Sequence, residues 1–142
     1  MIPEFRDDGY LPEGLHVATE AEVTLRFGTA TSRRRRLASR LRRWIELSRS
    51  VRAKRLFVDG SFVTAKPDPN DVDAVVWLGA DFVDRVSRGD VDAVELEMML
   101  VTRQPEEIFA AEDRRDWDDW VEFFSRTRES DGRTKGVVEV EL

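Results

Sequence analysis

Two aspartates, Asp71 and Asp73, stand two residues apart at the start of an apolar stretch and have the spacing of a metal site. Residues two apart on a strand project from the same face, and Mg²⁺ prefers carboxylate oxygens with phosphate and water. At about 7 Å and an effective dielectric near 20, the two carboxylates would repel by roughly 2 kcal/mol. A bound Mg²⁺ or Mn²⁺ would remove this cost, so the pair is the candidate metal site and catalytic centre.

A small turn, Gly60-Ser61, precedes Asp71 with nine residues between the serine and the aspartate. Glycine lets the backbone approach a phosphate closely, and the N–H groups of a following helical turn would face its oxygens. Lys66 lies in the intervening loop, where its ammonium could meet a terminal phosphate. We therefore assign Gly60, Ser61 and Lys66 to nucleotide binding. The alternatives are an ordinary loop pair, an Asx-type turn at Asp71 and a solvated lysine.

Two apolar segments, near 55–59 and 72–78, flank this loop and predict strands. We expect them to be neighbours in one mixed sheet. Ser61 should start a helical turn, and the two aspartates should lie on one face beside it.

This order of strand, Gly-Ser turn and carboxylate pair resembles the core of the nucleotidyltransferase superfamily, the minimal fold of the DNA polymerase β type. The residues that match the superfamily pattern are Val58, Gly60, Ser61, Asp71, Val72, Asp73 and Ala74. Along nearly its whole length, the chain also resembles small bacterial nucleotidyltransferase-like proteins with no settled substrate. The segments that carry this likeness are 11–16, 59–66, 69–73 and 123–139. The resemblance implies an α/β (α+β) fold with a nucleotide site.

Catalytic members of that superfamily place a third carboxylate on the following strand. We expect a strand over 93–101, where Glu95 and Glu97 share a polar face, and we favour Glu97 as the catalytic group. Glu139 and Glu141 also alternate with apolar residues, a pattern typical of a solvent-facing edge strand. If none of these side chains reaches the aspartates, the site would bind a nucleotide without turning it over.

Charge is concentrated in one segment. Residues 31–55 hold ten arginines and Lys54 against Glu46, a balance of +10 in a chain of net charge −6. Apolar residues recur there at helical spacing, which predicts one long amphipathic helix over 32–50. Its arginines could contact an RNA backbone or dock an acidic partner protein. The alternative is a solvated face that balances the chain's own acids.

The remaining pattern predicts a single domain at 19–142 after an N-terminal arm at 1–18. Thr19 and Glu22 form a capping box for a helix that ends near Gly28. Further elements are expected as a short helix between Asp81 and Gly89, a helix whose first turn holds Pro105, a helix over 117–124 and a last strand over 135–141. Flanking helices around one mixed sheet would result.

Composition excludes several kinds of site. The 142 residues include no cysteine and one histidine, so disulfides, cysteine-ligated zinc and two-histidine metal sites are excluded. With no apolar leader and no apolar run of membrane-spanning length, we expect a cytoplasmic protein without membrane contact.

The function expected from these observations is Mg²⁺-dependent transfer of a nucleotidyl group from a nucleoside triphosphate to an RNA or protein hydroxyl. The alternative is a catalytically incomplete member of the fold that binds a partner protein, as in a toxin–antitoxin or phage-defence pair. The third carboxylate separates the two, and activity as an enzyme stays open at this point.

Overall fold

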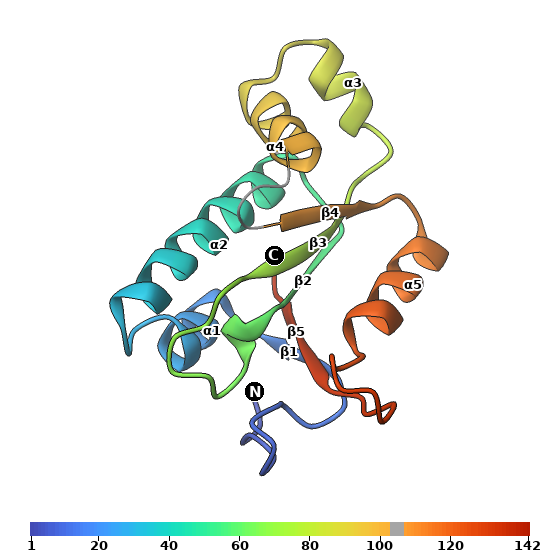
Figure 1. Cartoon of the computed structure of the whole chain (residues 1–142). Coiled ribbons are helices and arrows are strands. Elements are labelled where there is room, and N and C mark those ends of the chain that lie inside the picture. Colours follow the sequence, from blue (N-terminus) through green and yellow to red (C-terminus); the bar gives the residue numbers. More distant parts are fainter. Residues whose placement is uncertain (103–106) are drawn as a thin grey trace.

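The computed structural model describes residues 1–102 and 107–142. A mixed sheet lies at its centre, with strands in the order β1-β5-β2-β3-β4 (Figure 1). The strands are β1 (Gly14–Ala18), β2 (Arg55–Asp59), β3 (Asp73–Trp77), β4 (Glu107–Ala111) and β5 (Gly136–Val140). The helices of the described residues are α1 (Glu20–Phe27), α2 (Ser32–Ser50), α3 (Phe82–Ser87), α4 (Val91–Thr102) and α5 (Arg114–Phe124). The expected α+β fold with flanking helices is confirmed.

β2 and β3 are neighbours, as expected; they run antiparallel, and Asp59 pairs with Asp73 across them. The 3₁₀ turn η1 (Ser61–Val63) starts directly after β2, so Ser61 does begin a helical turn. β4 lies parallel to β3, and β5 lies antiparallel to β2 and parallel to β1. The end of β2 and the starts of β3, β4 and β5 therefore meet at one end of the sheet.

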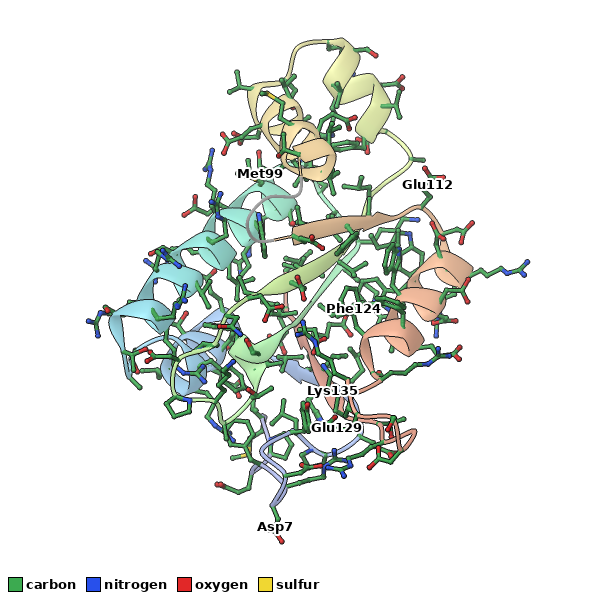
Figure 2. The ribbon with its side chains drawn as sticks, in the orientation of Figure 1. Asp7, Met99, Glu112, Phe124, Glu129 and Lys135 are labelled. Atoms are coloured by element: carbon green, nitrogen blue, oxygen red, sulfur yellow. The ribbon has the colours of Figure 1, made fainter. Side chains whose placement is uncertain are left out.

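The two faces of the sheet carry separate apolar clusters, because successive strand residues alternate between faces. Leu56 and Val58 face the cluster that α1, α2 and α4 cover. Phe57 faces the other cluster, which α5 covers with Trp117 (Figure 1). Figure 2 shows Phe124 of α5 directed toward this second face, on the same side as Lys135.

The expected helix ends are found where local capping chemistry specified them. Thr19 caps α1 and accepts from the Glu22 N–H at 3.1 Å, while the Glu22 side chain accepts from the Thr19 N–H, and Gly28 ends the helix. α2 spans Ser32–Ser50, which matches the amphipathic helix predicted over 32–50.

The strand expected over 93–101 is wrong, because this segment forms α4. Ala93 and Leu96 are buried against the core, and Leu100 packs beside them, which is helical spacing. Short apolar runs fit either period, so the alternation was misleading. Pro105, expected in a first helical turn, lies outside the described residues, and Glu107–Ala111, just after it, form strand β4.

The arm expected at 1–18 takes part in the sheet. Its residues 14–18 form the edge strand β1, and Leu11 is buried in the core. β5 consequently lies between β1 and β2, so the expected edge position of the strand that carries Glu139 is wrong. None of the helices in the described part of the chain is long and apolar enough to span a membrane.

Candidate functional site

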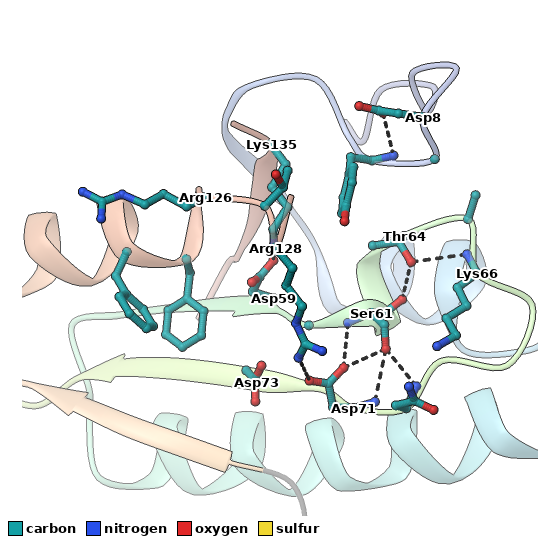
Figure 3. Close-up of a pocket in the computed structure, with 18 of the residues that line it drawn as sticks. Asp8, Asp59, Ser61, Thr64, Lys66, Asp71, Asp73, Arg126, Arg128 and Lys135 are labelled. Atoms are coloured by element: carbon teal, nitrogen blue, oxygen red, sulfur yellow. Dashed lines mark hydrogen bonds and ion pairs between the residues drawn. The ribbon is translucent and has the colours of Figure 1, made fainter. Parts of the chain in front are cut away.

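A pocket of about 790 Å³ lies at the end of the sheet where β2 stops and β3 starts. Its wall includes five of the residues singled out from the sequence: Gly60, Ser61, Lys66, Asp71 and Asp73. Figure 3 shows these groups with residues of the N-terminal segment above them and the segment after α5 beside them. The sheet, the η1 loop, the arm and the chain after α5 together form the site.

Gly60 is required by the geometry of the turn. Its φ is 91°, a left-handed conformation that side chains disfavour. A Cβ at this position would also stand 3.0 Å from the backbone oxygen of Asp71 and 3.1 Å from the nitrogen of Asp73. The glycine therefore lets the turn after β2 pass close to the segment that carries the two aspartates.

Ser61 and Asp71 are joined directly by hydrogen bonds, a closer contact than the expected position of the aspartates beside the turn. The Ser61 N–H and hydroxyl donate to Oδ1 of Asp71 at 2.9 and 2.7 Å. The N–H groups of Asn70 and Asp71 donate to the Ser61 hydroxyl oxygen at 2.8 and 3.2 Å. In Figure 3 these bonds form one closed network, which fixes the carboxylate beside the turn. Asp71 occupies the anion position that the turn offers.

Asp73, the first residue of β3, is held in a strongly acidic environment. Burial raises its pKa to about 7, and the neighbouring charges of Asp71, Asp59 and Glu107 act in the same direction. Lys135 opposes this shift. The position therefore disfavours a bare carboxylate and would favour a bound cation.

Three carboxylates form a row across this end of the sheet. Asp59 pairs with Asp73 on the antiparallel β3, and Asp73 pairs with Glu107 on the parallel β4. The alternation along each strand puts all three on the face covered by α5. Glu107 was not predicted from the sequence. Like Asp73, it stands directly before a short apolar run, and this shared pattern could have identified it.

Asp59 differs from the other two acids because it is already paired. Its side chain forms an ion pair with Lys135, and the two residues are only 4% and 8% exposed. Burial raises the pKa of Asp59, while the lysine charge lowers it. This buried pair links the end of β2 to the residue before β5, and breaking it would leave an unpaired buried charge.

Glu97 and Glu95, the expected third carboxylates, lie on α4 and do not line the pocket. Glu95 instead accepts from Arg43 of α2 at 2.6 and 2.8 Å, an interaction that lowers its pKa. Because 93–101 is helical, the strand beside β3 is β4, and Glu107 is the acid next to Asp73, although Glu107 does not line the pocket either. Glu139 does not line the pocket either, and its carboxylate accepts hydrogen bonds from Arg55.

Arg34 of α2 is buried and supports the loop that carries Ser61. Its guanidinium donates to the backbone oxygens of Phe62 at 2.7 Å, Thr64 at 2.8 Å and Lys66 at 2.5 Å, and to that of Phe27 at 3.0 Å. Burial lowers the pKa of Arg34. One arginine of the basic helix therefore supports the pocket from inside the molecule instead of facing a partner.

Other arginines of the basic helix have acidic partners within the chain. Arg43 binds Glu95 and Glu46, and Arg49 binds Glu20 at 2.8 Å. Arg36 is exposed. The positive charge that α2 offers to another molecule is thus smaller than its arginine content indicates.

Arg128 and an aromatic pair complete the pocket wall on the side of α5. The Arg128 side chain is 92% exposed, and its Nη2 lies 3.7 Å from Oδ2 of Asp71 (Figure 3). Phe123 and Phe124, at the end of α5, also line the pocket. The pocket therefore has an acidic floor, cations around it and an apolar rim.

The side chains present fit a cation that is shared with a ligand. Within residues 1–102 and 107–142, no three acidic or histidine side chains lie close enough together to hold a metal ion by themselves. Mg²⁺ is commonly held by one or two carboxylates plus phosphate oxygens and water. Asp71 and Asp73 would supply the carboxylates, and a phosphate ligand and water would supply the remaining oxygens.

Comparison with known proteins gives a family match. The model of a family of unknown function, DUF6932, matches residues 3–141, which is nearly the whole chain. No match was found among curated proteins or among solved structures.

Proposed function

We propose that this chain, which belongs to the DUF6932 family of unknown function, binds a nucleoside triphosphate with Mg²⁺ and transfers its nucleotidyl group to a hydroxyl of RNA or protein. The observation that carries the proposal is the joined arrangement of Ser61, Asp71 and Asp73 at one end of the β2–β3 pair. A phosphate-binding turn and a metal-binding carboxylate pair are the two parts that such chemistry requires.

The turn would bind the phosphates. When a triphosphate enters, its oxygens compete with Asp71 for the Ser61 N–H and hydroxyl, both within hydrogen-bond distance of that carboxylate now. Asp71 is then released toward the cation, and Arg128 loses its contact with Asp71 and is free to meet a phosphate oxygen. Lys66 lines the same pocket and adds a second positive charge.

Mg²⁺, when bound by Asp71 and Asp73, would neutralise the phosphate charge and polarise the α-phosphorus. The acceptor hydroxyl oxygen forms a bond to that phosphorus, the bond to the bridging oxygen breaks, and pyrophosphate leaves. Glu107 does not line the pocket, but it pairs with Asp73 in the sheet and its charge acts on Asp73, so we propose it as the group that takes the hydroxyl proton. It replaces Glu97 in this proposal.

Thermal melting with ATP or GTP tests the binding site. We expect stabilisation that needs Mg²⁺ or Mn²⁺ in the wild type and is lost in Asp73→Asn. Asp84→Asn, an exposed acid on α3, is the matched control and should keep the full shift. Equal shifts in the wild type and Asp73→Asn, or shifts independent of the metal, would contradict the assignment.

Transfer itself is tested with α-labelled nucleoside triphosphates, Mg²⁺ and total RNA or cell lysate. An active enzyme should label a discrete acceptor, and Glu107→Gln should stop labelling while leaving the metal-dependent melting shift in place. Labelling unchanged in Glu107→Gln would remove the proposed role of that residue.

A second candidate, a partner-binding module, is favoured by an apolar surface on α3 and α4. Its exposed residues are Val83, Val91, Met98 and Val101. Exposed apolar patches of this kind often contact other proteins. Co-purification of a partner that Met98→Glu abolishes, together with no labelled acceptor, would favour this candidate over the transferase.

A further inference from the structure

We infer that Phe123 is the stacking platform for the base of the bound nucleotide, and that the site therefore prefers purine nucleoside triphosphates. This inference rests on the proposed function and extends it from the triphosphate to the nucleoside. The acidic floor of the pocket accounts for a metal and phosphates, but it offers nothing for a base. Phe123 lies in the wall of the same pocket.

Phe123 is unusual among the rings of the described residues because it is large, apolar and 59% exposed. Its neighbours Phe124 and Trp120 contact it at centroid distances of 5.1 and 5.9 Å, with interplanar angles of 87° and 88°. Neither contact is a parallel stack. Phe123 is therefore held in place by rings that meet it edge to face, while much of its surface stays in solvent.

The rings behind Phe123 make this support rigid. Trp120 packs on Phe109 of β4 with centroids 4.8 Å apart, and Phe124 packs on Phe57 of β2 at 5.9 Å. Phe123 is thus connected through two aromatic contacts to strands whose ends carry Asp59 and Glu107. A preorganised ring loses little conformational freedom when a base stacks on it.

The chemistry of the pocket specifies the ligand class. Every base has a π-face, so stacking on one ring tolerates all bases, and the larger purines bury more area than pyrimidines. A ligand with a triphosphate and a planar base spans both parts of a pocket of about 790 Å³. Inorganic triphosphate has no base, so it would occupy only the part of the pocket formed by the charged side chains and would not contact Phe123.

Equilibrium binding of ATP, CTP and inorganic triphosphate, each with Mg²⁺, tests the inference in the full chain. We expect ATP to bind more tightly than CTP, and Phe123→Ala to weaken ATP binding about tenfold. Phe123→Trp should retain ATP affinity, because it keeps a stacking face. Inorganic triphosphate should bind equally to the wild type and both variants. Val83→Ala, another exposed apolar residue, is the matched control and should change nothing.

The outcomes separate this inference from the proposed function. ATP affinity unchanged in Phe123→Ala, or equal losses for ATP and inorganic triphosphate, would overturn the stacking role while the metal-dependent triphosphate site stands. No binding of any of the three ligands to the wild type would overturn the proposed function, and the stacking role with it. Melting temperatures of the variants verify that each is folded.

Discussion

Asp73 has a carboxyl group whose surroundings oppose its charge. Its pKa of about 7 results from burial and from the neighbouring acids Asp71, Asp59 and Glu107. A structural acid at the end of a strand would normally have a compensating partner, as Asp59 has in Lys135. Lys135 offsets only part of this shift, so a charged Asp73 would be unfavourable in the folded state and a bound cation would relieve that cost.

The stability of the protein should therefore depend on Asp73 between pH 4 and 8. The folded pKa of about 7 lies above the ordinary value of 3.8, so the native state binds a proton that the unfolded state has lost. This contribution is fully present below pH 4 and is lost as pH rises through 7. In chemical denaturation, Asp73→Asn should remove about 2 kcal/mol of this pH dependence, after allowance for solvent screening.

Mg²⁺ with ATP at pH 8 should recover the stability lost by the wild type and not alter Asp73→Asn. Asp84→Asn should show the wild-type pH profile. Parallel pH profiles for the wild type and Asp73→Asn would show that Asp73 is not the residue whose titration matters.

Gly60 and Gly89 allow the cost of the close turn to be measured. Both have positive φ, 91° and 78°, but a Cβ at Gly89 would meet no atom within 4 Å. Gly89→Ala should cost about 1 kcal/mol from backbone strain, and Gly60→Ala about 2–3 kcal/mol because its Cβ also presses on the Asp71 backbone. Urea denaturation measures both. Equal costs would show that the approach of the turn to Asp71 is not tight.

At the scale of elements, the site depends on α2 as much as on the strands. The segment that runs from η1 to residue 66 has no regular structure after Val63, and its carbonyls are held by the buried Arg34. Only a guanidinium offers enough N–H donors in one plane for four carbonyls. The basic helix and the candidate nucleotide site are therefore parts of one structural unit.

Arg34→Met should destabilise the fold by about 3 kcal/mol, because buried carbonyls lose their partners. Hydrogen exchange of segment 60–66 should rise in this variant, and Arg34→Lys should recover only part of the protection. Arg36→Met, an exposed neighbour on the same helix, is the matched control. Unchanged exchange in 60–66 would mean that the loop is held by other contacts.

In the molecule as a whole, negative and positive side chains are concentrated in different places. Acidic side chains lie close together at one end of the sheet. On α2, Arg43 and Arg49 form ion pairs with acidic side chains of α1, α4 and α2 itself. Arg33, which is half-buried, and Arg36, which is exposed, are two candidates on this helix for a contact with an RNA backbone. The acceptor would then approach from the α2 side.

If α2 contacts RNA, replacing Arg33 and Arg36 with Gln should weaken binding and lower the salt slope by about one logarithmic unit per lost phosphate contact. Arg43→Gln should have a smaller effect on the slope, because Arg43 is already bound to Glu95 and Glu46. Binding titrations over a range of salt concentrations measure this. A slope unchanged in the double variant would exclude α2 as the RNA surface.

The local parts of this site could be predicted from the residues alone. Ser61, Asp71 and Asp73 lie within one strand, turn and strand unit, so their spacing alone predicted their meeting, and Thr19 predicted the start of α1 through its own capping bonds. These outcomes depend on chemistry between residues at most about a dozen positions apart, which a single sequence displays directly.

Which distant side chains join these residues depends on how the strands and helices pack together. Glu107 reached Asp73 because β4 adds to the sheet beside β3, Lys135 reached Asp59 because β5 lies next to β2, and Arg34 was buried beneath the loop. Strand order, and the choice between helix and strand over 91–102, depend on which apolar faces are buried together. That is a property of the whole core, and local periodicity does not contain it.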